Sequence, residues 1–470
     1  MGLTDPIVAQ ASALTGYVGS FAWPPLLSVS RGVILTLLKN IQIGSLQVTD
    51  TDGTLTVCGS PRRSLDENEE KSAASHTELK VLDDLFWVRL LLFADMGFAE
   101  SYMLGEVACP DITAFFKLFI NNKKYLSGTT LMSNISGKIA GLVRKTNTLQ
   151  NARLNISAHY DISNEMFAAF LSPDMTYSCP IWLPKSNSNS AHETLEQAQY
   201  RKLCRFVNNA QIKATDHVLE IGTGWGSFAI LAVQKTGCRV TSLTLSEEQK
   251  RLAEDRIRAA GFQDRINVLL CDYRSLPVPA EEDKYDKVVS IEMLEAVGAE
   301  YLETYFRCID NLMKSEEGVA VFQCITMPES RYEAYSASDD FIRRYIFPGG
   351  HLPTITQLLD AVRAGSSSKT QSPRLIPESV ENIGPHYAKT LRLWRQAFMQ
   401  NFNSEIRPAL LAEHGGNGNK MSEEDVDVFR RKWEYYFSYC EAGFMTKTLG
   451  DVIITVGREG AVSMMDDVPL

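Results

Sequence analysis

One short stretch decides the fold of this chain, and it reads Val218-Leu219-Glu220-Ile221-Gly222-Thr223-Gly224-Trp225-Gly226. An apolar segment typical of a strand covers 217–221, and a helical pattern follows over 226–235. Glycine at three alternate positions lets the backbone adopt positive φ and pass close beneath a ligand. A dinucleotide site would instead read GxGxxG to hold a pyrophosphate. The acidic Glu220 before the first glycine disfavours a pyrophosphate and favours a cationic ligand.

The chain after this stretch alternates between strand and helix patterns. The segments expected to form strands cover 239–245, 266–271, 287–291, 319–325 and, near the end, 452–456. A helix is expected over 246–260, because Ser246 is a good N-cap and acidic residues follow it. Such alternation predicts an α/β fold with a doubly wound, Rossmann-like parallel sheet. The ligands of such sheets bind at the carboxyl ends of the strands.

The GxGxG spacing resembles the first motif of class I S-adenosylmethionine-dependent methyltransferases. At the end of the second strand, Thr244 and Gln249 are candidates for binding the ribose hydroxyls, and Glu247 is a weaker candidate. At the end of the third strand, Asp272 could accept a hydrogen bond from the adenine amino group and Tyr273 could cover the ring. The alternatives are that Gln249 is only a solvated helix residue and that the Asp272 segment is a plain turn.

The N-terminal residues 1–125 predict a smaller, mixed α/β domain that is a candidate for contact with lipid or with a second copy of the chain. Helical patterns cover 26–38, 86–95 and 112–120, and a hairpin pattern covers 46–57. A polar linker is expected over 126–153. The catalytic domain is expected over 154–470, with a helical lid insertion at about 328–445.

The composition argues against several classes of function. The net charge of −10 argues against broad nucleic-acid binding, which needs a basic face. No stretch of about 20 residues is apolar enough to span a bilayer, and the N-terminus lacks the basic start of a signal peptide. The 9 cysteines are scattered without a CxxC pair, which favours free thiols over a structural zinc site. We therefore expect a cytoplasmic protein without a metal that contacts membranes only peripherally.

Several further segments together resemble the cyclopropane fatty acid synthase family. They read His159-Tyr160-Asp161-Ile162-Ser163-Asn164, Met175-Thr176-Tyr177-Ser178-Cys179, Ile291-Glu292-Met293-Leu294-Glu295-Ala296-Val297-Gly298, Phe341-Ile342-Arg343-Arg344-Tyr345-Ile346-Phe347-Pro348-Gly349-Gly350, Gly384-Pro385-His386-Tyr387-Ala388-Lys389-Thr390-Leu391 with Trp394, and 429–444. The resemblance covers 154–457 and extends more loosely into the N-terminal domain. It implies transfer of the methyl group of S-adenosylmethionine to the double bond of an unsaturated phospholipid acyl chain, followed by closure of a cyclopropane ring.

The resemblance also implies a mechanism without a protein nucleophile. The alkene attacks the sulfonium methyl group, and the resulting carbocation loses a proton from the new methyl to a bound bicarbonate ion. The bicarbonate ligands map here to Cys179, Glu295, Tyr387 and the main chain around Ile325. Gln323, a fourth candidate catalytic residue, stands where bacterial members have a histidine. Glutamine donates a hydrogen bond but cannot titrate near neutral pH, so the identity of the base is open.

The family motifs and the strand ends together give the candidate cofactor site. It comprises Tyr160, Tyr177, Ser178, Glu220, Gly222, Gly224, Trp225, Gly226, Thr244, Leu245, Gln249, Asp272, Tyr273, Arg274 and Ile291. For the candidate catalytic residues, purely structural alternatives stay open. Cys179 could be a small buried hydrophobe, Glu295 a helix cap or arginine partner, and Tyr387 a core tyrosine.

The lipid itself is harder to place in the sequence. Five apolar positions suit either an ordinary core or the wall of an acyl tunnel: Met166, Phe167, Phe170, Phe341 and Phe347. Arg343 and Arg344 suit either a phospholipid headgroup or a solvated helix.

Three rival functions stay open beside cyclopropanation. A sphingolipid C9-methyltransferase would share the carbocation but leave a methyl branch. Other class I methyltransferases act on soluble small molecules. A non-catalytic lipid- or cofactor-binding protein would retain the fold, and Gln323 is the only feature that points to it. The family precedent also suggests a homodimer.

Overall fold

The computed structural model describes residues 25–59, 76–126, 163–366, 374–414 and 421–465 of the 470-residue chain. The chain divides into two compact units. One comprises residues 1–160 and 422–442, and the other comprises residues 161–421 and 443–470. No helix in the described part of the chain combines the length and the hydropathy that a membrane span requires.

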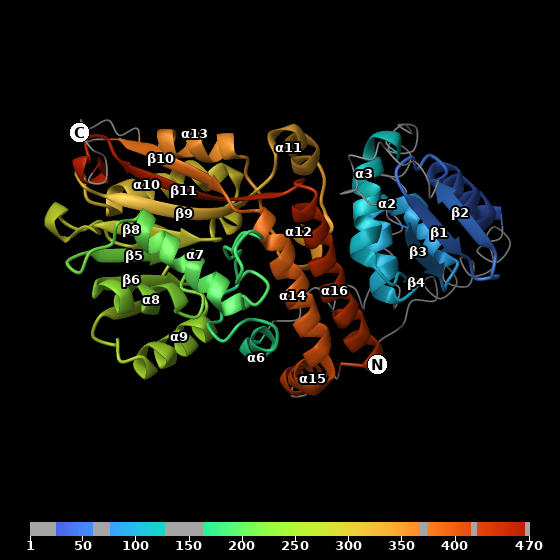
Figure 1. Ribbon diagram of the computed structural model, residues 1–470, viewed down its shortest axis with the longest axis horizontal. Helices are drawn as coiled ribbons and strands as arrows, with labels where there is room; N and C mark the ends of the chain where they lie inside the picture. Colours follow the sequence, from blue (N-terminus) through green and yellow to red (C-terminus); the bar gives the residue numbers. More distant parts are fainter. Residues whose placement is uncertain (1–24, 60–75, 127–162, 367–373, 415–420, 466–470) are drawn as a thin grey trace, which may run out of the picture. The chain divides into compact units, whose positions relative to one another are not determined.

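The larger unit contains a seven-stranded sheet in the order β10-β11-β9-β8-β5-β6-β7 (Figure 1). The strands are β5 (His217–Ile221), β6 (Arg239–Thr244), β7 (Ile266–Leu270), β8 (Lys287–Ile291), β9 (Val319–Thr326), β10 (Leu375–Asn382) and β11 (Gly450–Arg458). The five strands from β5 to β9 pair with one another in parallel, as predicted. The fold class is thus confirmed, with one correction. β11 runs antiparallel to β9, and β10, which the sequence did not predict, runs antiparallel to β11.

Helices flank this sheet and connect its strands. They are α6 (Asn164–Ala168), α7 (Leu195–Asn209), α8 (Ser227–Thr236), α9 (Glu247–Ala259), α10 (Leu302–Leu312), α11 (Glu329–Ser336), α12 (Phe341–Tyr345), α13 (Ile355–Gly365), α14 (Pro385–Asn401) and α15 (Arg407–His414). The predicted cap of α9 is confirmed, because the Ser246 hydroxyl accepts a hydrogen bond from the main-chain N–H of Gln249 at 3.1 Å. Thr194 and Gln197 form a capping box at the start of α7.

The two faces of the central strands differ in character. Leu219, Phe322 and Ile454 belong to a buried apolar core that residues of α10 and α13 complete. Successive side chains of a strand point to opposite faces. Glu220 and Gln323, one position further along, therefore point to the other face, where both are buried.

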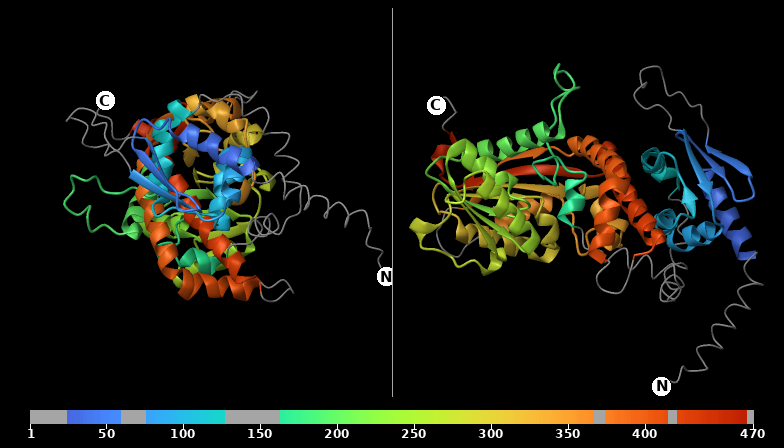
Figure 2. Two further views of the ribbon diagram at one scale, coloured as in Figure 1. Left: turned by 90° about the vertical axis from the view of Figure 1, so that its right-hand side faces the viewer. Right: turned by 90° about the horizontal axis from the view of Figure 1, so that it is seen from below.

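The smaller unit has a four-stranded sheet in the order β2-β1-β3-β4, with α2 and α3 beside it in both views of Figure 2. Its elements are a helix over 25–38, β1 (Ser45–Thr49), β2 (Leu55–Gly59), β3 (His76–Val81), α2 (Leu85–Leu104), β4 (Val107–Ala108) and α3 (Ile112–Leu126). β1 and β2 form the predicted antiparallel hairpin, whereas β3, parallel to β1, was not predicted.

A late helix, α16 (Glu423–Met445), belongs to this smaller unit as far as residue 442. Aromatic packing explains why. The ring of Tyr435 lies 5.0 Å from that of Phe116, and the ring of Tyr439 lies 5.3 Å from it, both edge to face. The division by packing therefore differs from the expected division at 125, because a segment assigned to the lid packs with the N-terminal residues.

Candidate active site

The glycine-rich turn after β5 has an open side. Gly222, Gly224 and Gly226 have φ values of 102°, 52° and 85°, in the region that favours glycine. The main-chain N–H groups of Gly222 and Thr223 donate to the carbonyl of Leu243 at 3.0 and 2.9 Å, which fixes the turn against β6. A Cβ atom on Gly224 would meet no heavy atom within 4 Å. The turn is rigid, and a ligand can approach its backbone at this point.

Trp225 fixes the glycine-rich turn through its contacts with neighbouring segments. Its indole N–H donates to the side-chain oxygen of Asn164 at 2.7 Å, and its ring lies 5.0 Å from that of Phe167. Arg256 of α9 donates to the carbonyl of Trp225 at 2.5 Å and to that of Asp174 at 2.9 Å. Arg256 was not predicted, because its role depends on carbonyls that are distant in the sequence.

Glu220 lies buried at the end of β5 and faces hydroxyl groups. The Ser242 hydroxyl donates to Glu220 Oε2 at 2.5 Å and lies 2.7 Å from the Thr223 hydroxyl. Burial raises the pKa of Glu220 to about 8, because a charged carboxylate is poorly solvated there. A cationic ligand would stabilise the charged form. The buried acid and the open glycine therefore fit S-adenosylmethionine, whose sulfonium and ammonium groups are both cationic.

The residues at the end of β6 are arranged around one side-chain hydrogen bond. The Thr244 hydroxyl donates to the Gln249 side-chain oxygen at 2.9 Å, so Gln249 is held at the strand end and is not merely solvated. Leu245 is 74% exposed. An exposed leucine between polar neighbours suits contact with a bound ligand.

At the end of β7, Asp272 pairs with Arg274. Asp272 Oδ1 accepts from the main-chain N–H and from Nε of Arg274, both at 2.9 Å, and this hydrogen bonding lowers the pKa of Asp272. The ring of Tyr273 lies 5.0 Å from that of Tyr305, edge to face. Asp272 thus closes a turn, and any adenine contact would share its carboxylate with Arg274. Ile291 ends β8 and is half-buried.

The segment before α7 carries two other predicted cofactor residues. Ser178 is buried, and its hydroxyl accepts from the Lys202 ammonium at 2.6 Å. The ring of Tyr177 lies 5.0 Å from that of Trp394 in an aromatic cluster. Tyr160 lies outside the described residues.

Three of the four candidate catalytic residues meet at Glu292, which the sequence analysis did not single out. Glu292 Oε1 accepts from the main-chain N–H of Cys179 at 2.7 Å and from Gln323 Nε2 at 2.7 Å. Glu292 Oε2 accepts from the Tyr387 hydroxyl at 2.8 Å. Glu292 is the acceptor in each of these three hydrogen bonds, so all three favour its charged form.

Two further carboxyl groups, of the half-buried Glu295 and the buried Asp451, complete what we call the carboxyl cluster, namely Glu292, Glu295 and Asp451. Gln323 Nε2 donates to Asp451 Oδ2 at 2.9 Å as well as to Glu292. Glu295 Oε1 accepts from the main-chain N–H of Ile325 at 2.5 Å. Within the described part of the chain, Glu295 Oε2, Gln323 Oε1 and Asp451 Oδ1 are buried without a hydrogen-bond partner.

The cluster cannot hold three negative charges in a buried place, since like charges repel. Burial and the charge of Glu292 raise the pKa of Glu295 to about 8 and that of Asp451 well above its usual value. Burial raises the pKa of Glu292 too, but its hydrogen bonds oppose that shift. The three hydrogen bonds that Glu292 accepts therefore favour the negative charge on Glu292 over Glu295 and Asp451.

A bicarbonate ion does not fit these residues as the family resemblance implied. The main-chain N–H of Cys179 and the hydroxyl of Tyr387 already donate to Glu292. The main-chain N–H of Ile325 already donates to Glu295. An added anion would compete with Glu292 and Glu295 for these donors, and it would lie beside the negative charge of Glu292.

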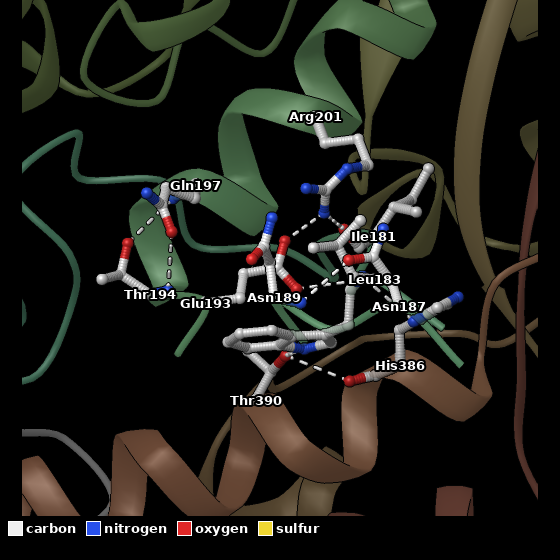
Figure 3. Close-up of polar contacts among 11 residues, drawn as sticks. Ile181, Leu183, Asn187, Asn189, Glu193, Thr194, Gln197, Arg201, His386 and Thr390 are labelled. Carbon is white, nitrogen blue, oxygen red and sulfur yellow. Dashed lines mark hydrogen bonds and ion pairs between the residues drawn. The ribbon is translucent and has the colours of Figure 1, made fainter. Parts of the chain in front are cut away.

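The loop over 180–183, which follows Cys179, is tied to the helices on both sides (Figure 3). The main-chain N–H of Trp182 donates to His386 Nδ1 at 3.1 Å, and its indole N–H donates to the Thr390 hydroxyl at 3.0 Å. Arg201 of α7 donates to a carbonyl of the same loop at 2.8 Å. These contacts fix the main-chain N–H that Cys179 offers to the cluster.

Sequence reasoning missed Glu292, Asp451 and Lys202. A signal for Glu292 was present, because it directly follows β8 and stands three residues before Glu295. Asp451 reaches the cluster through the antiparallel pairing of β11, in which it lies opposite Ile325. Lys202 occupies a helix position that sequence alone assigns to the surface, yet it is completely buried.

A mostly parallel seven-stranded sheet, with a glycine-rich turn and an acid at the end of its central strand, defines a class I S-adenosylmethionine-dependent methyltransferase. The profile of the mycolic acid cyclopropane synthetase family matches residues 147–453. The chain belongs to that family.

Individual relatives agree with this placement. The chain is 35% identical over 456 residues to the tuberculostearic acid methyltransferase UfaA1 of Mycobacterium tuberculosis, covering 94% of this chain and 97% of that one. It is 26% identical over 405 residues to the cyclopropane-fatty-acyl-phospholipid synthase of Escherichia coli, covering 83% and 91%. Among solved structures, the mycolic acid cyclopropane synthase CmaA1 complexed with SAH and CTAB superposes with a TM-score of 0.52 at 27% identity, covering 65% of this chain and 98% of that one.

Proposed function

We propose that this protein transfers the methyl group of S-adenosylmethionine to the double bond of an unsaturated phospholipid acyl chain and that the product closes to a cyclopropane. The observation that carries the proposal is the buried carboxyl cluster at the carboxyl ends of β8 and β9, beside the glycine-rich turn. An alkene needs no deprotonation before it attacks a methyl group. A site for this chemistry needs a negative environment for a carbocation and an acceptor for one proton.

The chain's own residues divide these tasks. Glu220 and the glycine-rich turn bind the cofactor, which supplies an electrophilic methyl group when bound. Gln323 and Tyr387 hold Glu292 in a fixed orientation. The buried surroundings exclude water, which would otherwise capture the cation as an alcohol.

The apolar side chains near Trp225 supply the proposed acyl contact. Phe167 lies 5.7 Å from Phe170 and 5.0 Å from Trp225, ring to ring, whereas Met166 is completely packed. We therefore favour Phe167 as acyl wall and Met166 as core.

Of the two arginines considered for headgroup binding, Arg344 is the better candidate. Arg343 donates to the carbonyl of Tyr335 at 2.7 Å and stacks on that ring at 4.3 Å, so it serves the local structure. Phe341 is buried, whereas Phe347 is 41% exposed. We propose that Arg344 and Phe347 meet the lipid surface, as part of a peripheral membrane contact.

A second candidate product is a methyl branch. The 35% identity to a tuberculostearic acid methyltransferase extends along almost the whole of both chains, which favours it. The same carbocation would then lose a proton from a chain carbon and leave a methylated alkene. A sphingolipid acceptor would belong to the same alternative.

The test is incubation of the purified protein with methyl-labelled S-adenosylmethionine and vesicles of mono-unsaturated phospholipid. Mass spectrometry and NMR of the hydrolysed lipid should give an acyl chain heavier by one methylene with cyclopropane ring protons. Vinyl or methyl-branch signals would support the second candidate. Absence of label from lipid, although the cofactor binds, would refute both.

Sedimentation velocity and vesicle co-sedimentation test the proposed homodimer and membrane contact.

A further inference from the structure

We infer that Glu292 is the chain's own catalytic base, which takes the proton from the methylated acyl chain and leaves no role for a bound bicarbonate ion. The inference rests on the proposed function, because it assigns a residue to the proton transfer of that reaction. It concerns a residue at the carboxyl end of β8, directly after Ile291.

The first argument is the number and direction of donors. A main-chain N–H, a side-chain amide and a phenol, from Cys179, Gln323 and Tyr387, all donate to the two oxygens of Glu292. These groups come from the segment before α7, from β9 and from α14. Three separate segments thus hold one carboxylate, as a preorganised base requires.

The second argument is the orientation of Gln323. Its Nε2 atom lies 2.7 Å from Glu292 Oε1 and 2.9 Å from Asp451 Oδ2, and its two protons can serve both acids. The opposite orientation would turn Gln323 Oε1 toward two carboxyl groups. Histidine has only one proton on each ring nitrogen, so it could not serve both acids from a single atom. Glutamine at this position is therefore matched to a carboxylate from the chain.

The third argument is the backbone of Glu292. Its φ is 49°, a conformation that glycine adopts freely and other residues rarely adopt. Its main-chain N–H donates to the carbonyl of Gln323 at 2.9 Å, which keeps this conformation in place. A strained residue with a half-buried acidic side chain is a sign of function rather than of stability.

The charges around Glu292 agree with a base. Asp451 and Glu295 are the acidic neighbours, and burial raises the pKa of each, which favours their neutral forms beside a charged Glu292. The charge of Lys202 acts on Glu292, and burial lowers the pKa of Lys202. Cys179 and Tyr387 also face the carboxylate. Burial raises the pKa of Glu292 as well, which makes its carboxylate more basic than one in water.

The proton transfer balances without another reagent. The π electrons of the alkene form the bond to the methyl carbon while the carbon–sulfur bond of the donor breaks. The electron pair of that bond stays on sulfur, S-adenosylhomocysteine leaves, and the positive charge passes to the acyl chain. A Glu292 oxygen then takes one proton from the new methyl group. The electron pair of that C–H bond closes the ring, and Glu292 becomes a neutral acid. It returns its proton to water before the next turnover.

The experiment compares the full chain with Glu292→Gln and Glu292→Gly, in buffer freed of carbon dioxide and in buffer with added bicarbonate. The substrates are methyl-labelled S-adenosylmethionine and mono-unsaturated phospholipid vesicles. The unchanged protein should be equally active in both buffers. Glu292→Gln should lose about 100-fold or more of the ring product while it still binds S-adenosylhomocysteine. Glu292→Gly should regain activity with bicarbonate, because the ion can occupy the space that the carboxylate leaves.

A binding measurement separates this inference from the proposed function. With ¹³C-labelled bicarbonate, NMR should show no bound ion on the unchanged protein and a bound ion on Glu292→Gly. Gln211→Gly is the matched control, because Gln211 also has a positive φ, of 51°, and lies at the end of α7 outside the cluster. It should behave as the unchanged protein.

The outcomes decide between the two claims. A bicarbonate requirement in the unchanged protein, a bound ion on it, or full ring formation by Glu292→Gln would each overturn the role of Glu292. If Glu292→Gly fails to fold, the unchanged protein and Glu292→Gln still decide. If the unchanged protein methylates no lipid at all, the proposed function falls, and the ¹³C measurement alone then shows whether a bicarbonate site exists.

Discussion

The cofactor pocket and the carboxyl cluster lie at the same edge of one sheet, yet they are assembled in different ways. The pocket comes mainly from three consecutive strand ends, after β5, β6 and β7. The cluster takes its acids from the ends of β8 and β11, and its donors Cys179, Gln323 and Tyr387 come from three further segments. The pocket residues therefore lie in short local sequence motifs, whereas the cluster residues come together only when the sheet forms.

The two regions also differ in what compensates the negative charge of their acidic side chains. Glu220 stands alone among hydroxyl groups in the pocket, so a cation from outside can compensate its charge. In the cluster, Glu292 is compensated by donors of the chain itself. The pocket is therefore built to receive a ligand, and the cluster is built to keep a charge in place. Substitutions should be able to damage one region without the other.

The largest effect is expected from Gly224→Val, which attacks the pocket alone. A β-branched side chain is strained at positive φ and would project into the open side of the turn. We expect affinity for S-adenosylhomocysteine to fall by about 100-fold or more, equal to about 2.7 kcal/mol, measured by isothermal titration calorimetry.

Gly261→Val is the matched control for Gly224→Val. Gly261 also has a positive φ, of 77°, and open space around it, but it lies after α9. Its substitution should carry the same backbone strain and leave affinity unchanged. Equal loss of affinity in both variants would show that strain, and not blocked space, is responsible.

The second-largest effect is expected from Gln323→His, which should disturb the cluster and leave the pocket intact. An imidazole cannot donate from one atom to both Glu292 and Asp451, so one buried carboxyl group loses its partner. We expect the free energy of unfolding to fall by about 1–3 kcal/mol, measured by urea denaturation, with unchanged affinity for S-adenosylhomocysteine. Undiminished stability would mean that the amide is not needed to hold the two acids.

The fold was largely predictable because each parallel strand is recognisable from its own sequence. The parallel strands from β5 to β9 are short apolar runs separated by helices, and their bounds agree with the prediction to within a residue. β10 was missed because it reads Leu375-Ile376-Pro377-Glu378-Ser379-Val380-Glu381-Asn382, a polar and mostly exposed edge strand with a proline. Only its pairing with β11 makes it a strand.

The site was predictable to the extent that its motifs are local. The positions of Glu220 and Cys179 followed from the turn and from the family motif, and the structure buries both. Glu292 stood within a recognised motif but was not distinguished from Glu295. Sequence does not show which of two acids receives the donors, because those donors come from distant segments. Asp451 gave no signal, since its position depends on antiparallel pairing.

The pH dependence of cofactor affinity tests the role of Glu220 in the pocket. The pKa of Glu220 is raised to about 8, so most of this side chain is protonated at pH 7 in the ligand-free protein. A bound cation favours the carboxylate, so binding should release a proton. Affinity for S-adenosylmethionine should therefore rise from pH 6 to pH 8, by up to about 50-fold if only the carboxylate binds.

Glu220→Gln provides the reference for this titration, because it removes the protein's proton but retains the ligand's own ionisation. Its affinity should lack the rise, and calorimetry in buffers of different ionisation enthalpy should show less proton release than for the unchanged protein. A rise of the same size in both proteins would assign the effect to the ligand or to the cluster.

The smallest effect is expected from Thr194→Ala, which touches neither region directly. Thr194 accepts from the main-chain N–H of Gln197 at 3.2 Å and caps α7, the helix that carries Lys202 (Figure 3). Loss of such a cap costs about 1 kcal/mol of stability. Thr194→Ser retains the hydroxyl and should be nearly neutral in the same denaturation experiment. Because Thr194 is exposed and Lys202 lies more than two turns further along the helix, neither variant should alter cofactor affinity or methyl transfer. A loss of methyl transfer in Thr194→Ala alone would mean that the cluster depends on how firmly α7 is anchored, and not only on its own hydrogen bonds.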